Sequence, residues 1–178
     1  MANMKRIGYG QVEPNHLSAQ RTAQIYAQLP ADASYDHLEN GQFVKYDYAE
    51  GKVNKAAGAG EYMMVFNEVK LYDGYRETYK DYAMKKADFV DGVMVPRVIK
   101  TNIGDIYTTN CLKEASKGAK ETTAMEDLKA GDLLKVNAEG FLEKDGGPIS
   151  GIAAPVFEVA KRYTLADGQD AVKVMRVK

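Results

Sequence analysis

Only one cysteine, Cys111, and two histidines, His16 and His37, occur in the 178 residues. A single thiol cannot form a disulfide within the chain, and it is typical of a protein made in a reducing cytoplasm. Neither histidine belongs to a set of ligands at metal-binding spacing, so we interpret both as surface residues. Cys111 is interpreted as a small buried residue rather than a nucleophile. The sequence therefore predicts no catalytic residue, no metal and no cofactor.

Long hydrophobic runs are also missing. The longest, residues 62–66, is far shorter than the roughly 20 residues that a membrane-spanning helix needs. Residues 1–9 carry charge but no apolar segment, so we expect no secretory signal. Lys and Arg total 24 against 25 Asp and Glu, and the net charge of -1 argues against nucleic acid as the main ligand. We expect one soluble domain with neither a membrane nor a nucleic-acid partner.

An internal repeat is the clearest pattern that is present. Residues 38–46 read LENGQFVKY and residues 128–136 read LKAGDLLKV, and Ala-Glu-Gly follows each within a few residues, at 49–51 and 138–140. A glycine turn, a short apolar strand and a second glycine turn are typical of a β-hairpin. We therefore predict equivalent hairpins at 38–53 and 128–142, opened by Gly41 and Gly131.

Strand signals dominate the rest of the chain. Further β-prone runs occur at 62–66 and on both sides of an Asp-Gly turn at 166–169. The run at 62–66 is apolar on both faces, so we expect a strand that is covered on both sides. In the last run, Val172 and Val174 alternate with Lys173 and Arg176, which predicts an exposed Arg176. The expected fold is mainly β, a small barrel or sandwich built of hairpins, with an N-terminal arm and one short helix.

The first 35 residues are polar and glutamine-rich, and we assign them to an arm, with residues 36–178 as the β-rich body. Leu17, Ile25 and Leu29 are eight and four apart, which suits a short amphipathic helix beginning near Asn15. Two interpretations stay open: an arm that folds onto a neighbouring subunit, and a terminal helix packed on its own domain. For the first, Leu17, Arg21 and Ile25 are the candidate partner-binding residues.

Tyrosines recur at helical spacing within residues 72–86, at Tyr72, Tyr75, Tyr79 and Tyr82. Spacings of three, four and three place the four phenols on one face of a helix. This pattern fits an amphipathic helix laid on the β body. It also fits a partner-binding surface made of these tyrosines and Arg76, because Tyr and Arg are enriched at the centres of interfaces.

Three segments carry a resemblance to a known family: GYGQVEPNHLSAQRTAQIYAQLP (8–30), GEYMMVFNEVKLYDGYRETYKDYAMKK (60–86) and VPRVIKTNIGDIYTTN (95–110). They resemble small virion structural proteins of tailed bacteriophages of Gram-positive hosts, often labelled head-fibre or capsid decoration proteins. The resemblance spans most of the chain and is weaker over residues 113–130. Its motifs are structural and transfer no catalytic residue.

The resemblance implies a non-enzymatic protein, a cement or head-fibre base, that binds and stabilises the shell of the major capsid protein. Such a protein is made in the host bacterial cytoplasm and lies on the capsid exterior, as a homo-oligomer or beside neighbouring copies of itself. The alternative is a carbohydrate- or host-surface-binding module on the virion. An exposed aromatic platform would favour this alternative, whereas the lack of tryptophan counts against it.

Overall fold

The computed structural model describes Arg6 and residues 8–19, 24–56, 61–67, 82–90, 94–113 and 128–178. Its sheets are antiparallel. The six-stranded sheet runs β1 (Val12–His16), β9 (Ile106–Thr109), β13 (Asp170–Arg176), β12 (Val156–Thr164), β10 (Leu133–Val136), β11 (Leu142–Asp145). The five-stranded sheet runs β2 (Ile25–Tyr26), β8 (Val98–Ile99), β6 (Met63–Val65), β4 (Phe43–Asp47), β5 (Lys52–Lys55). A third sheet pairs β3 (His37–Glu39) with β7 (Ala83–Lys85), and the helix α2 (Lys86–Val90) follows β7.

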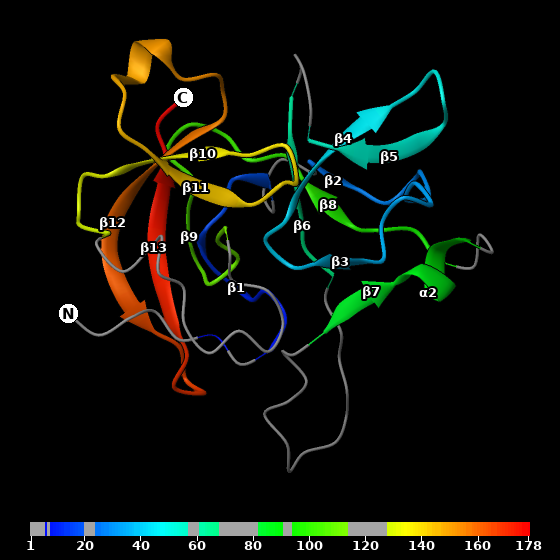
Figure 1. The fold of residues 1–178 in the computed structure, drawn as a ribbon, viewed down its shortest axis with the longest axis horizontal. Coiled ribbons are helices and arrows are strands. Elements are labelled where there is room, and N and C mark those ends of the chain that lie inside the picture. Colours follow the sequence, from blue (N-terminus) through cyan, green and yellow to red (C-terminus); the bar gives the residue numbers. More distant parts are fainter. Residues whose placement is uncertain are drawn as a thin grey trace.

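The mainly β prediction is confirmed, and the sheets of the described chain do not close into a barrel. The six-stranded sheet lies on one side of the molecule, and the five-stranded sheet lies on the other with β3, β7 and α2 (Figure 1). Both predicted hairpins form, as β4–β5 and β10–β11. The strands on both sides of the Asp-Gly turn form the hairpin β12–β13.

The helix predicted to begin near Asn15 does not begin there; Ala19 is helical, and residues 20–23 lie outside the described residues. Val12–His16 is instead the edge strand β1, paired with β9, and Ile25–Tyr26 is the strand β2. Three apolar residues made a weak helical stripe, and the ladder with β9 satisfies the backbone of this segment instead. Pro14 is tolerated in β1 because an edge strand leaves one side unpaired.

The tyrosine-rich helix predicted over residues 72–86 lies mostly outside the described residues, which resume at Tyr82. Where its end is described, the prediction is wrong, because Ala83–Lys85 forms strand β7. Pairing with β3 decides this conformation: Leu38 lies opposite Met84, and both side chains are buried in one apolar cluster. A helix begins only at Lys86.

The duplication extends well beyond the two hairpins. In chain order, β2, β4, β5, β6 and β8 make the five-stranded sheet in the spatial order β5-β4-β6-β8-β2. The strands β9, β10, β11, β12 and β13 make five of the six strands of the other sheet, in the order β11-β10-β12-β13-β9. The two orders are the same when the strands are matched one by one along the chain. The molecule is therefore built from two tandem five-stranded units, with β1 added to the edge of the second.

Hydrogen bonds at the opening turns show that the two units also share their register. The amide of Gly41 donates to Val65 O and that of Gly131 to Val159 O, each at 2.8 Å. In return, Val65 N donates to Gln42 O at 2.8 Å, and Val159 N donates to Asp132 O at 2.9 Å. The strands β6 and β12 thus continue the ladder from the same position of the opening turn in their units.

The same turn recurs a third time before β9. Gly41, Gly131 and Gly104 have φ of 90°, 91° and 92°, the left-handed region that favours glycine. In the last two turns the aspartate after the glycine closes the loop, because Asp132 Oδ2 accepts the Lys129 amide at 2.7 Å and Asp105 Oδ2 accepts the Asn102 amide at 2.8 Å. Gly-Asp is therefore a local signal for the start of a strand in this chain.

The core consists of two apolar clusters, one on each face of the five-stranded sheet. Phe43 packs between the two large sheets, with its ring centroid 5.3 Å from that of Phe157. Its neighbour Val44 points to the opposite face, into the cluster formed with β3, β7 and α2. Met63 and Met64 divide between the clusters in the same way, which confirms that the strand at 62–66 is covered on both sides.

Arg176 corrects the predicted alternation of the last strand. It lies on the face of β13 that holds Val172 and Val174, and its side chain is buried. Its Nη1 donates to the carbonyl oxygen of Thr101 and forms an ion pair with Glu61 at 2.7 Å. The expectation that Arg176 is exposed is therefore wrong, because two partners from the first unit compensate its burial.

Candidate functional site

The predicted partner-binding residues are only partly covered by the structure. Arg21, Tyr72, Tyr75, Arg76 and Tyr79 lie outside the described residues. Leu17 is 4% exposed in the core between the large sheets, and Ile25 packs against that core from β2. Tyr82 is half-buried against the second cluster, and burial raises the pKa of its phenol. The described members therefore contribute to the packing of this chain: Leu17 and Ile25 share one cluster, and Tyr82 packs against the other.

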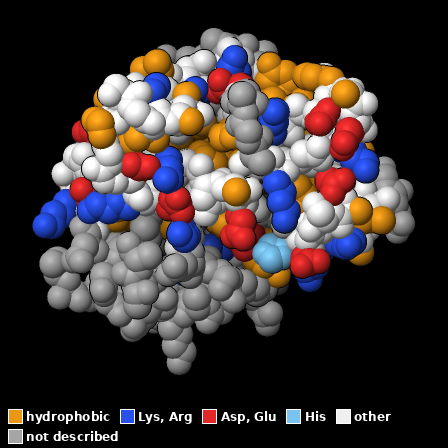
Figure 2. All heavy atoms as spheres, turned by 45° about the horizontal axis from the view of Figure 1, so that its top comes forward, with side chains coloured by type: hydrophobic (Ala, Val, Ile, Leu, Met, Phe, Trp, Pro, Cys, Tyr) orange, Lys and Arg blue, Asp and Glu red, His pale blue; other side chains and the backbone are white. Residues whose placement is uncertain are grey.

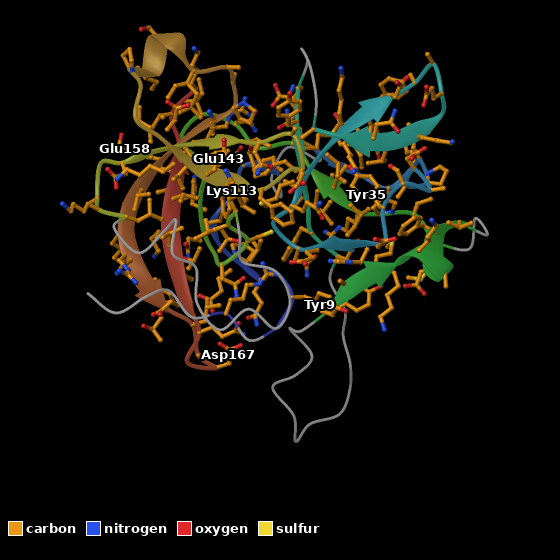
Figure 3. The ribbon with its side chains drawn as sticks, in the orientation of Figure 1. Tyr9, Tyr35, Lys113, Glu143, Glu158 and Asp167 are labelled. Carbon is orange, nitrogen blue, oxygen red and sulfur yellow. The ribbon has the colours of Figure 1, made fainter. Side chains whose placement is uncertain are left out.

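A buried ion pair fastens the N-terminal segment to the first unit. Arg6 Nη2 donates to Glu39 Oε2, and both side chains are almost completely buried. Glu39 Oε2 also accepts the Gly10 amide at 2.8 Å, while its Oε1 lies 3.0 Å from His37 Nε2. Figure 3 shows Tyr9 on this segment beside β7, and its ring centroid is 5.6 Å from that of His37. These contacts fold Arg6 and residues 8–10 against the turn that opens the first repeat.

The same segment is joined to the second unit by side-chain amides. Asn110 Oδ1 accepts the Gln11 amide at 2.7 Å, and Gln11 Nε2 donates to Asp167 Oδ2 at 2.9 Å. Asp167 also accepts from Gln169 Nε2 at 2.7 Å. Asp167 lies at the tip of the β12–β13 hairpin (Figure 3). Arg6 and residues 8–11 therefore bridge the two units, and the hydrogen bonds to Asp167 hold the pKa of its carboxyl below its usual range.

Cys111 lies next to Gly10 and Gly41 and is completely buried. Burial raises the pKa of its thiol, and the nearby Glu39 carboxylate raises it further. A thiol in this state is inert, because the thiolate is the reactive form. The position also explains two close approaches of glycine, since a Cβ at Gly10 or Gly41 would press against the Cys111 side chain. The interpretation of Cys111 as a small buried residue is consistent with this packing.

A polar hollow of about 420 Å³ opens beside the β4–β5 hairpin. Its lining comprises Asp32, Ser34, Lys45, Asp47, Glu50, Asn54 and Lys55. Asn54 Nδ2 donates to Asp47 Oδ2 and to Glu50 Oε2, both at 3.3 Å, so two carboxylates are held together at the hairpin turn. Asp32 accepts the Ser34 amide and an ammonium hydrogen of Lys52, which lower the pKa of its carboxyl to about 2.

Tyr48 stands at the tip of the same hairpin and is 71% exposed. Its ring meets that of Tyr46 edge-on at 5.8 Å, and Tyr46 meets Tyr26 edge-on at 5.9 Å. Tyr46 is buried and its hydroxyl accepts the Gln28 amide at 3.3 Å. The inner rings hold the exposed Tyr48 ring in place, and together they form a small aromatic platform.

The matching face of the second unit is occupied by ion pairs instead. Lys135 lies opposite Glu143, in the register that places Lys45 opposite Asn54 in the first unit. Glu143 Oε2 is 3.1 Å from Lys113 Nζ, and Lys135 Nζ is 2.9 Å from Asp145. Lys113 and Glu143 lie together in Figure 3. The pair to Asp145 raises the pKa of Lys135. The two units thus share a backbone but carry different chemistry on the equivalent hairpins.

Four buried charged residues escaped the sequence reasoning: Arg6, Glu39, Asp105 and Arg176. Arg6 and Glu39 are 33 residues apart, so no local spacing relates them. One weak signal existed in the repeat, because Glu39 occupies the position where the second copy has an exposed Lys129. The charge at this position is negative in the first copy and positive in the second. Such a difference indicates a contact that only one copy makes, here the ion pair of Glu39.

Among the described residues, no group of three or more His, Cys, Asp or Glu side chains is arranged to hold a metal ion. Within the same part of the chain, the helices are too short and too polar to reach across a bilayer. Charged side chains of both signs are interspersed on the face shown in Figure 2. Comparisons of the chain with protein-family models, with curated proteins and with solved structures found no match.

Proposed function

We propose that this chain is a non-enzymatic decoration protein of a tailed-bacteriophage capsid, which binds the outside of the major capsid shell. One observation carries the proposal: the three segments with the family resemblance form strands that are hydrogen-bonded to one another. From residues 8–30, β1 pairs with β9 and β2 pairs with β8, both of which belong to residues 95–110. From residues 60–86, β6 pairs with β8. The segments with the resemblance are therefore neighbours in the fold, joined by strand pairs in both large sheets.

The framework suits a protein that binds a repeating shell. Two units of the same topology stand in one chain, and Gly10 and Gln11 link them through buried hydrogen bonds. On a lattice, a chain that contacts two adjacent subunits gains from effective concentration, so that each contact can be weak. A capsid shell presents such neighbours at fixed spacing, either as copies of the major capsid protein or as further copies of this chain.

Co-sedimentation with purified capsids of the phage that encodes the chain tests the proposal. We expect saturable binding, with hundreds of copies per particle for a decoration protein. A dozen copies or fewer would indicate a vertex or neck component instead. Absence of binding to mature capsids and to capsids stripped of their native copies would refute the capsid role.

A carbohydrate-binding role is the second candidate, because the aromatic platform at Tyr48 lies on the hairpin that borders the polar hollow. Exposed tyrosine rings pack against the apolar faces of sugars, and paired carboxylates with an amide bind hydroxyl groups. Saturation-transfer NMR with host cell-wall glycans tests this role. Tyr48→Ala should abolish the transfer, whereas Ile103→Ala, which removes another highly exposed apolar side chain, should preserve it. Equal transfer to both variants would exclude the platform as the binding site.

A further inference from the structure

A β-bulge interrupts β12 and changes the direction of its side chains. Val159 pairs with Val174 and Lys161 pairs with Lys173, so Ala160 has no partner of its own on β13. Val159 faces the core, and strict alternation would point Lys161 to the same side. The bulge moves Lys161 and Tyr163 to the outer face of the six-stranded sheet, where Lys173 also lies.

Two ammonium groups share one aromatic ring at this position. Lys161 Nζ lies 5.6 Å and Lys173 Nζ 5.7 Å from the centroid of the Tyr163 ring. Like charges directly opposite one another on antiparallel strands repel, and attraction to the ring offsets only part of this repulsion. Neither ammonium forms an ion pair with a carboxylate in the part of the chain that the structure describes.

The neighbouring acidic residues do not pair with these two charges. Glu158 lies on the same face, opposite Met175 on β13, but among the described residues it forms no ion pair with Lys161 or Lys173. Thr108 lies opposite Lys173 on β9, and its hydroxyl donates to Asn15 Oδ1 at 2.9 Å. Glu13 lies one strand further away, opposite Thr108. The strands β12 and β13 lie on the opposite side of the molecule from β4 and β5 (Figure 1). Lys161 is exposed and Lys173 is half-buried. A repelling pair of lysines, brought together by a bulge, indicates a surface whose counter-charge comes from another molecule.

We propose that Lys161, Tyr163 and Lys173, here termed the lysine clamp, bind a carboxylate-bearing segment of an acidic protein partner. Two convergent ammonium groups match one or two carboxylates, and the ring between them keeps both in position. Nucleic acid fits less well, since phosphate binding draws on many Lys and Arg residues and the chain has a net charge of -1. The inference rests on the proposed function, in which the acidic segment belongs to the capsid shell.

The test compares two double variants that change the net charge equally. Lys161→Gln with Lys173→Gln removes the clamp charges, and Lys86→Gln with Lys129→Gln removes two exposed lysines elsewhere. The probe is a short oligo-glutamate peptide, with single-stranded DNA of matched charge as the second probe. We expect the clamp variant to lose roughly tenfold or more in affinity for oligo-glutamate, and the control to change little. The clamp variant should unfold at the same temperature as wild type or higher, because a repulsion is removed.

Each outcome decides a separate point. Equal oligo-glutamate affinity for the two variants overturns the clamp, and so does a lower unfolding temperature of the clamp variant. Clamp-dependent binding of DNA that is tighter than that of oligo-glutamate overturns the choice of an acidic protein and favours nucleic acid. The same variants are then tested on capsids. If wild-type protein does not bind capsids but still binds oligo-glutamate through the clamp, the proposed function fails while the clamp stands.

Discussion

Gly140 gives the sharpest test of how the two units meet. It has φ of 90°, and its carbonyl oxygen accepts the Phe43 amide at 2.7 Å, a hydrogen bond from the first unit to the second. A Cβ added at Gly140 would fall on the carbonyl oxygen of Phe43, well inside van der Waals contact. Gly131 and Gly51 also have positive φ, but a Cβ added at either one meets open space.

We expect Gly131→Ala and Gly51→Ala to reduce the free energy of unfolding by about 1–2 kcal/mol each, the cost of left-handed backbone for a side chain. Gly140→Ala adds overpacking, about 1–3 kcal/mol, and weakens a buried hydrogen bond, about 0.5–1.5 kcal/mol. The difference from the two controls should be about 2–4 kcal/mol. In a chain of 178 residues this corresponds to roughly 10 °C in the midpoint of thermal unfolding.

Urea denaturation of the three variants, followed by circular dichroism, measures these differences. The reasoning is refuted if Gly140→Ala lies within about 0.5 kcal/mol of both controls, the level at which independent substitutions agree. In that case the contact between Gly140 and Phe43 would not hold the units together. A larger m-value change in Gly140→Ala than in the controls would show partial separation of the units before unfolding.

Three further predictions concern buried and charged groups. Glu39→Ala should destabilise the chain by about 3–5 kcal/mol because it leaves Arg6 charged and buried. Arg6→Leu combined with Glu39→Leu should recover most of this loss. Equal losses in the free energy of unfolding for the single and double variants, measured by denaturant titration, would contradict the ion-pair argument. Cys111 should react with a thiol reagent only at the rate of unfolding, since burial raises its pKa, and fast labelling of native protein would count against this packing. The pKa of Asp32 is lowered from 3.8 to about 2, so its pairing stabilises the fold above pH 3.8 and this contribution disappears as the pH falls through 2. An NMR titration of Asp32 checks this, and Lys52→Gln should move the pKa of Asp32 upward.

The sequence by itself determined the strands that are bounded by turns. The repeat with Gly41 and Gly131, and the Asp-Gly turn at 167–168, predicted three hairpins, and all three form. These signals are local, because a glycine with positive φ and a few β-prone residues suffice to fix a hairpin. The apolar run at 62–66 likewise carried its own evidence for a strand covered on both sides.

Tertiary pairing decided the segments whose local signals were weak. β1 occupies the predicted start of a helix near Asn15 because β9 offered a free edge, and β7 formed where a helical tyrosine pattern ended because β3 lay beside it. The bulge in β12 moved Lys161 to the outer face, a change that strict alternation in the sequence does not reveal. Partners that are distant in sequence set each of these conformations.

The clearest division between the two levels lies in the repeated Ala-Glu-Gly. In sequence the two copies are identical, and each closes a hairpin with a glycine of positive φ. Gly51 faces open space, whereas Gly140 supports the backbone of Phe43 in the other unit. Local chemistry made both turns, but only the packing of one unit on the other made Gly140 a contact between them, because close approach of two backbones leaves no room for a side chain.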